Sequence, residues 1–292
     1  MNTTSPQALD RLSSLIERFH VSASLFHTGP LCGVTRWDAE PGQGVLCVLR
    51  SGSTVLTHHP HAGVVPCIEV TEPTLFFYPQ PLAHRFHPAR QGEANFACAV
   101  VQFEGGAKHP LAQALPALTV LPLAKVPGLA GALALLFDEA DQVRCGHRLI
   151  ADRLFEVVLL QLLRWLLDHG EQGGVSMGLV RGLADRQLAR ALTAMHEQPQ
   201  RCWSVETLAA QAAMSRSAFA HRFKQVVGVA PADYLTDWRM ALAQKLLRQG
   251  RSVKLLAPEL GYANASALSR VFAQRMGMSP RAWRAKSREM VG

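Results

Sequence analysis

Two stretches in the C-terminal third of the sequence decide the fold: residues 205–224 read VETLAAQAAMSRSAFAHRFK, and residues 253–272 read VKLLAPELGYANASALSRVF. The beginning of the first stretch recurs in the second after 48 residues, and its remainder, with the residues that follow, recurs after 49. The recurring pairs are Val205 and Val253, Leu208 and Leu256, Ala209 and Ala257, Ser217 and Ser266, Phe219 and Leu268, Phe223 and Phe272, Gly228 and Gly277, Pro231 and Pro280, and Tyr234 and Trp283. A duplication of this kind indicates two copies of one supersecondary unit.

Each copy has the pattern of a short helix, a tight turn and a second helix. Ser204 is a suitable N-cap for the first helix of the first copy, and Ser215 and Asn264 are placed to cap the two second helices. Apolar residues four positions apart would pack each second helix onto the first. These residues are Phe219 and Phe223 in one copy and Leu268 and Phe272 in the other. Each copy is therefore predicted to be a helix-turn-helix unit.

One long helix is predicted between the two copies. It begins at Pro231, which suits a first helical turn, and its apolar stripe consists of Leu235, Trp238, Leu242 and Leu246. A helix over residues 231–249 would be about 28 Å long. That length approaches the roughly 34 Å of one B-DNA turn, so both second helices could enter successive major grooves.

The outer faces of the two second helices carry small polar and basic side chains. Such a helix fits the major groove, where arginine can donate two hydrogen bonds to guanine. The predicted DNA-binding residues are Ser215, Arg216, Ser217, Ala220, His221, Arg222 and Lys224 in the first copy, and Asn264, Ala265, Ser266, Ser269 and Arg270 in the second. For Arg222 and Lys224, phosphate contact or plain solvation is the alternative, because half or more of protein–DNA hydrogen bonds go to the backbone.

The distribution of charge agrees with this prediction. Residues 185–292 hold 17 Lys and Arg against 7 Asp and Glu, whereas residues 1–184 hold 13 against 15. The basic excess therefore lies wholly in the C-terminal third, as expected of a module that binds a polyanion.

The segments WSVETLA, MSRSAFAHRFK, GVAPADYL and LGYANASALSRVFAQRMGMSPRAWR, within residues 185–288, resemble the AraC/XylS family of bacterial transcription regulators. The resemblance implies a regulator, and an activator, that binds double-stranded DNA, contacts RNA polymerase and works in the cytoplasm at the bacterial nucleoid. It also implies that Ser217, Ala220, His221, Ala265, Ser266, Ser269 and Arg270 face base edges.

Two features of the sequence depart from the family pattern. Ser217 and Ala220 are small, which leaves readout to His221, Arg216 and Arg222, and Pro258 is predicted to distort or shorten its helix.

Residues 28–104 have the pattern of short strands separated by turns, which is typical of a sandwich or a small barrel. The predicted strands are residues 44–49, 53–58, 67–70, 74–78 and 95–103. GVLCVLRSG at residues 44–52 and EPTLFFYPQPLAH at residues 72–84 resemble the cupin-type sensor domain of one branch of the same family. The predicted fold class is α+β, with an N-terminal cupin-like β-barrel plus helices and a C-terminal all-α domain with two helix-turn-helix motifs.

The sequence leaves three alternatives for the signal that such a domain senses. A small-molecule effector pocket would be lined by Trp37, Tyr78, His84 and Phe86, with Phe77 nearby, although these aromatic residues could simply fill the core. Redox sensing would use Cys32, Cys67 or Cys98. A cupin metal site would use His59, His61 and His84, but the HxH pair is displaced and no glutamate follows at the usual interval. We therefore expect no metal and no cofactor.

Apolar spacing predicts helices over residues 129–137 and 149–167. The second helix is apolar on more than one side, so it packs within its own domain and could also form a homodimer interface. The expected domains are a sensor at residues 1–125, a helical dimerisation or packing segment at 126–170, a glycine-rich linker at 171–184 and the DNA-binding domain at 185–292.

Several classes of protein are disfavoured. The sequence shows neither a signal-peptide pattern nor an apolar run long enough to span a membrane, and its six cysteines are scattered without a CxxC pair. No catalytic set stands at a telling spacing, so we do not expect an enzyme. The alternatives are a cupin enzyme or metal-binding protein with a DNA-binding tail, which lacks the cupin glutamate, and an architectural DNA-binding protein, which leaves the apolar N-terminal region unexplained.

Overall fold

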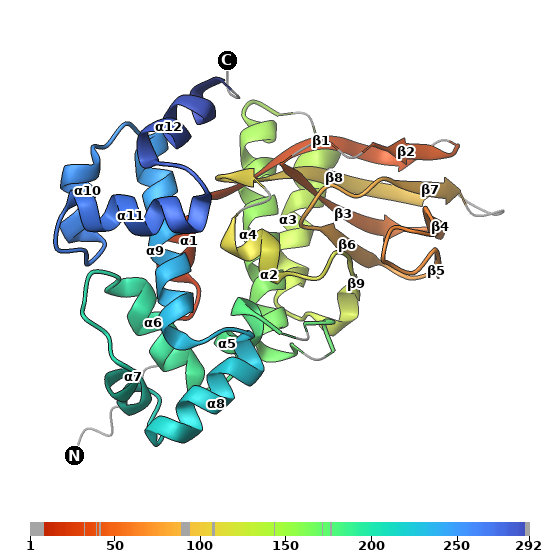
Figure 1. Ribbon diagram of the computed structural model, residues 1–292. Coiled ribbons are helices and arrows are strands. Elements are labelled where there is room, and N and C mark those ends of the chain that lie inside the picture. Colours follow the sequence, from red (N-terminus) through yellow and green to blue (C-terminus); the bar gives the residue numbers. More distant parts are fainter. Residues whose placement is uncertain are drawn as a thin grey trace. The chain divides into compact units, whose positions relative to one another are not determined.

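The computed structural model describes residues 9–31, 33–38, 40, 42–88, 94–106, 109–142, 144–170, 172–175 and 177–289. The chain divides into two compact units (Figure 1). One unit, the sensor unit, comprises residues 20–176. The other, the DNA-binding unit, comprises residues 1–19 together with 177–292.

The sensor unit is built on two antiparallel sheets. The five-stranded sheet has the order β1-β8-β3-β6-β9, and the four-stranded sheet has the order β2-β7-β4-β5. The strands are β1 (Val21–Leu31), β2 (Thr35–Trp37), β3 (Gln43–Ser51), β4 (Thr54–His58), β5 (Cys67–Val70), β6 (Thr74–Tyr78), β7 (His84–Pro88), β8 (Ala94–Phe103) and β9 (Thr119–Pro122). The α+β class with a cupin-like N-terminal domain is confirmed, but the two sheets do not close into the barrel that the sequence predicted.

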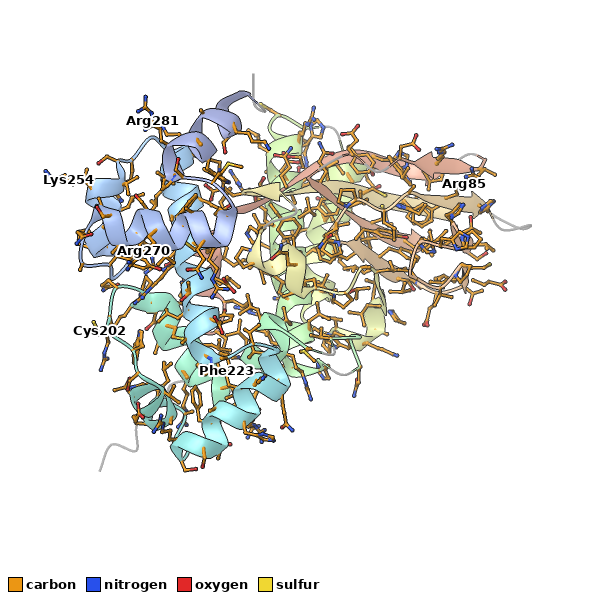
Figure 2. All side chains as sticks on the ribbon, in the orientation of Figure 1. Arg85, Cys202, Phe223, Lys254, Arg270 and Arg281 are labelled. Atoms are coloured by element: carbon orange, nitrogen blue, oxygen red, sulfur yellow. The ribbon has the colours of Figure 1, made fainter. Side chains whose placement is uncertain are left out.

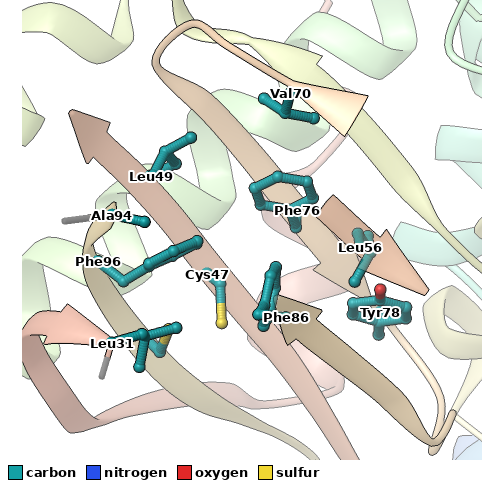
Figure 3. Close-up of a cluster of buried hydrophobic side chains, with 11 residues drawn as sticks. Leu31, Cys47, Leu49, Leu56, Val70, Phe76, Tyr78, Phe86, Ala94 and Phe96 are labelled. Carbon is teal, nitrogen blue, oxygen red and sulfur yellow. The ribbon is translucent and has the colours of Figure 1, made fainter. Parts of the chain in front are cut away.

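The space between the two sheets is filled by apolar side chains (Figure 3). They come from alternate positions of the strands, because successive side chains of a strand point to opposite faces. This sheet core consists of Leu31, Cys47, Leu49, Leu56, Val70, Phe76, Tyr78, Phe86, Ala94, Phe96 and Cys98. Phe77 is also fully buried, but it points to the other face of its strand and is not part of the sheet core.

Helices complete the sensor unit. They are α2 (Pro110–Ala114), a 3-10 turn (Leu123–Lys125), α3 (Leu129–Asp141) and α4 (His147–Asp168). The amide of Leu25, in the edge strand β1, donates to the Asp152 carboxylate of α4 over 2.6 Å. The Trp165 indole donates to the carbonyl of Lys125 over 3.1 Å. These bonds fix α4 to the sheet and to the segment before α3.

The described part of the DNA-binding unit is helical. Its helices are α1 (Ser13–Arg18), α5 (Leu179–Ala184), α6 (Leu188–Glu197), α7 (Val205–Gln211), α8 (Arg216–Val227), α9 (Pro231–Arg248), α10 (Val253–Glu259), α11 (Ala265–Met276) and α12 (Pro280–Glu289). Pro258 lies inside α10, which ends one residue later. No helix among the described residues is long and apolar enough to cross a bilayer.

Two domain boundaries differ from those expected. Residues 179–184, expected in the linker, form α5, and its Gly182 is a packing residue, since a Cβ there would lie 2.7 Å from Leu192 Cδ1. The N-terminal helix α1, expected in the sensor, makes its packing contacts within the DNA-binding unit. Glycine content suggested a linker because composition alone does not distinguish a flexible glycine from one that permits close packing.

Candidate nucleic-acid interface and sensor site

The two helix-turn-helix units are α7 with α8 and α10 with α11; we call α8 and α11 the recognition helices. The side-chain oxygen of Ser215 accepts from the amide of Ala218 over 3.3 Å, and Asn264 Oδ1 accepts from that of Ala267 over 2.9 Å. Both predicted N-caps are therefore present. Ser204 caps α7, and with Thr207 it forms a full capping box.

The turns of the two units share a backbone feature. Ala213 in the first unit and Gly261 in the second, 48 positions later, both have a positive φ, of 52° and 79°. Glycine accepts this conformation without a steric penalty, whereas alanine does not. At Gly261 the reason for glycine is also packing, because a Cβ would lie 2.7 Å from the carbonyl oxygen of Gln200.

The inner faces of the recognition helices are buried as predicted. Phe219, Phe223 and Phe272 are completely buried, and Leu268 is 1% exposed. The rings of Phe219 and Phe223 lie 5.5 Å apart. Because each recognition helix is anchored along one side, its opposite side faces outward.

The outer face of α8 presents most of the predicted residues to solvent. Ser215, Arg216, Ser217, His221, Arg222 and Lys224 are exposed, and Ala220 is half-buried. Two of the arginines have protein partners: Arg222 pairs with Asp185 over 2.7 Å, and Arg216 pairs with Glu206 over 2.8 Å. Asp185 also accepts from the amide of Leu188 at the start of α6, so Arg222 ties α8 to α6.

The outer face of α11 carries Arg270, which is exposed (Figure 2). Asn264 and Ser266 are also exposed, and Ala265 and Ser269 are half-buried. Sequence reasoning missed two further basic residues near this helix in the sequence, Lys254 on α10 and Arg281 on α12, both exposed. A scan of basic residues just after each helix start would have found them.

The helix between the two units is continuous. At 18 residues, α9 is about 27 Å long. Arg275 of α11 pairs with Asp233 over 2.5 Å and with Asp237 over 3.5 Å, both on α9. These ion pairs connect the linking helix α9 to the second recognition helix α11 and help to orient α11 relative to α9.

In the sensor unit, three of the four predicted effector residues meet at one end of the sheet core. The ring of Tyr78 stacks on His84 with centres 4.1 Å apart, and Phe86 meets His84 edge-on at 5.4 Å. The fourth residue, Trp37, is directly opposite His84 in the register of β2 and β7. We call Trp37, Tyr78, His84 and Phe86, with His58, the aromatic site.

Sequence reasoning missed His58, although Thr54, Leu56 and His58 alternate inward along β4. Its Nδ1 donates to the carbonyl of Val65 over 2.7 Å, so its Nε2 accepts from the Tyr78 hydroxyl over 2.9 Å. Burial lowers the pKa of His58 and raises that of Tyr78. Burial also lowers the pKa of His84 to about 4, so both imidazoles are neutral at pH 7.

Comparison with known proteins identifies both parts of the chain. A family profile described as cupin matches residues 10–168, which is more than half of the chain. The chain belongs to the cupin family. A profile described as a helix-turn-helix domain matches residues 208–286 of this cupin-family chain. The combination of a cupin domain with an AraC-type helix-turn-helix domain, recognised from the sequence, is thereby confirmed.

Individual relatives of this cupin-family chain are similar over different lengths. An AraC-like transcription regulator of Streptomyces lividans is 41% identical over 150 residues, which are 51% of this chain and 49% of the relative. The chain thus matches about half the length of its Streptomyces relatives. An HTH-type transcriptional regulator of Haemophilus influenzae is 26% identical over 276 residues, covering 86% of this chain and 89% of that protein. The solved DNA-binding domain of AdpA, in complex with a target DNA, is 36% identical and covers 36% of this chain and 96% of that domain, with a TM-score of 0.34.

The remaining predicted residues of the cupin domain do not join the aromatic site. His59 and His61 are exposed in the turn after β4, and the described residues contain no group of three or more His, Cys, Asp or Glu placed to hold a metal ion. Cys32 lies outside the described residues, and Cys67 is exposed at the start of β5.

Cys98 is completely buried opposite Cys47, a neighbour that sequence reasoning did not consider. Burial raises the pKa of the Cys98 thiol well above its usual value, and the adjacent Cys47 raises it further. A protonated thiol is a poor nucleophile, which opposes the redox role predicted for Cys98.

Proposed function

We propose that this chain is a sequence-specific DNA-binding transcription regulator whose cupin domain responds to a small-molecule effector. One observation carries the proposal: two capped recognition helices with exposed polar faces are joined by one continuous helix. The similarity to AraC-like and HTH-type transcription regulators supports it. Activation and contact with RNA polymerase belong to the proposal by family resemblance, as does action at the nucleoid in the cytoplasm.

The structure sharpens the proposed roles of individual side chains. Arg270 is our candidate for base readout in the second unit, because it is exposed on α11 without an ion-pair partner among the described residues. In the first unit the candidates are Ser217 and His221. Lys224, with Lys254 and Arg281, is assigned to phosphates. Arg222 is moved from base readout to a structural role, since Asp185 already engages it.

The test begins with DNA sites selected by the full-length protein from a random duplex library. Arg270→Ala should lose about 1–3 kcal/mol of binding to the selected site and much less to random DNA. Lys254→Ala should weaken both about equally and lower the slope of log affinity against log salt by about 1. Arg85→Ala is the matched control, because it removes one positive charge from an exposed strand residue of the sensor unit.

The outcomes separate the parts of the proposal. If the wild-type protein selects no common sequence, the proposed function is wrong. If selection succeeds but Arg270→Ala discriminates as well as Arg85→Ala, only the assignment of Arg270 fails.

We further propose a homodimer formed through α4. This helix presents an exposed row at spacings of three and four residues, in which Leu149 is 73%, Val157 41% and Leu160 37% exposed. Arg153 and Arg164 complete the row and are also exposed. Pairing two such rows would bury apolar surface and bring two DNA-binding units together, which raises affinity through effective concentration.

A further inference from the structure

A buried hydrogen-bond donor and a buried acceptor belong to two opposed residues of the aromatic site. Because Trp37 and His84 are directly opposite in an antiparallel pair, their side chains leave the same face of the sheet. Trp37 Nε1 and His84 Nε2 are both buried, and neither has a hydrogen-bond partner in the described part of the chain. His84 Nδ1 donates to the carbonyl of Leu82 over 2.8 Å, so its Nε2 carries no proton and is an acceptor.

Two unsatisfied buried polar atoms require an explanation, since leaving one without a partner costs about 1–3 kcal/mol. One group from outside the chain that reached both atoms would have to accept from the indole and donate to the imidazole. A hydroxyl accepts from the indole N–H through its oxygen and donates its proton to the imidazole. A carboxylate has no proton to donate and an ammonium has no lone pair to accept with, so neither satisfies both atoms.

The surroundings of the two atoms select a neutral, apolar molecule. Tyr78 and Phe86 flank His84, and Phe26 meets Trp37 edge-on with ring centres 4.6 Å apart. The sheet core beyond them contains no charged side chain. An ion would therefore lose its hydration without gaining a counter-charge.

A ligand could reach the aromatic site by displacing strand β2. This strand lies at the edge of its sheet and pairs with β7 over only three residues, Thr35 to Trp37. Displacing Trp37 therefore breaks fewer ladder bonds than moving any other strand of that sheet would.

We propose that Trp37 and His84 bind the hydroxyl group of a small neutral ligand, and that phenols are its chemical class. This assignment rests on the effector-sensing role proposed above and specifies its ligand. Phenols fit because their ring packs against aromatic neighbours while their single hydroxyl both donates and accepts.

The test uses the full-length protein labelled with ¹⁵N, in which the five tryptophans give separate indole N–H resonances. Trp37→Phe identifies the resonance of Trp37. Phenol should shift that resonance and saturate at a concentration at least tenfold lower than toluene, which has the same ring without a hydroxyl. His84→Phe should weaken phenol binding by about tenfold. Trp203→Phe, in the DNA-binding unit, is the control and should leave phenol binding unchanged.

Two results would overturn the inference. In one, toluene binds as tightly as phenol, so the hydroxyl is not recognised. In the other, phenol leaves the Trp37 resonance unmoved up to millimolar concentration, so a buried water serves the two atoms. DNA binding is measured on the same sample: intact selection without phenol binding defeats this inference alone, whereas phenol binding without DNA selection defeats the proposed regulator.

Discussion

The ring of Phe19 meets the indole of Trp238 edge-on, with ring centres 5.0 Å apart. This contact joins the end of α1 to the middle of α9. Around it, Lys245 Nζ donates to the carbonyl of Arg18 over 2.6 Å, and the Arg18 guanidinium donates to the carbonyl of Glu197 over 2.8 Å. The helix that begins the described chain is thus part of the DNA-binding unit, and it stabilises the linking helix from the side.

Phe19→Ala should therefore loosen α9. Phe19 is 2% exposed, and truncating a buried phenylalanine costs about 3–5 kcal/mol. Hydrogen exchange read by mass spectrometry on peptides from α9 should show faster exchange, while β3 and β8 in the sensor unit keep their protection. Glu17→Ala, an exposed change on the same helix, serves as the control. Unchanged exchange in α9 would contradict the role given to α1.

The packing of α1 could not be predicted from the sequence. The segment has neither a long apolar period nor a motif, and its partners are more than 170 positions away, so nothing local connects it to α6 or α9. The helix-turn-helix units could be predicted because duplication, N-caps and the pairs at Phe219 and Phe223 each depend on nearby residues.

The sensor unit was predictable strand by strand where turns flank each strand. Residues 67–70 and 74–78 were placed correctly, whereas β1, with its register shift between Leu25 and His27, and β9 were not proposed as strands. His58 was not predicted as a site residue, because it stands just before the HxH pattern of His59 and His61 and outside it. The inward orientation of His58 follows from the alternation of side chains along β4. Its hydrogen bond to Tyr78 depends on how the two sheets pack, which the sequence does not show.

Acid should destabilise the DNA-binding unit through His196. This residue is completely buried and stacked on Trp238 at 3.9 Å, and burial, with the charge of Arg18, lowers its pKa to about 3 from an ordinary 6.5. As pH falls below 6.5, the unfolded chain takes up a proton that the folded unit does not bind until about pH 3. The free energy of unfolding should therefore fall by about 1.4 kcal/mol for each pH unit in that window and be unaffected by His196 above it.

Urea unfolding monitored on α9 at several pH values would check this slope. His196→Gln should flatten it, because glutamine does not titrate, although the variant is less stable throughout. Gln225→Ala, at an exposed position of α8, is the control and should leave the slope unchanged, because neither side chain titrates. A slope that is identical in the wild type and in His196→Gln would show that other groups cause the acid sensitivity.

The five cysteines that the structure describes should divide into two classes of reactivity. Cys67, Cys145 and Cys202 are exposed, whereas Cys47 and Cys98 are completely buried. Brief treatment of the native protein with iodoacetamide, followed by peptide mapping, should modify the first three and spare the buried pair, and denaturation should make all five reactive. Rapid native modification of Cys98 would restore it as a redox candidate and show that the two sheets open readily.

Val157→Glu should disrupt the proposed dimer. Val157 lies at the middle of the exposed row on α4, so a paired helix would have to desolvate two carboxylates there in place of apolar side chains, and association should weaken by at least tenfold. Sedimentation at micromolar concentration would measure the change. Leu135→Glu is the matched control, because Leu135 is 60% exposed on the neighbouring α3 and outside the row. If the wild type sediments only as a monomer, with and without its selected DNA, α4 is not an interface. If both variants dissociate equally, the interface lies across α3 as well.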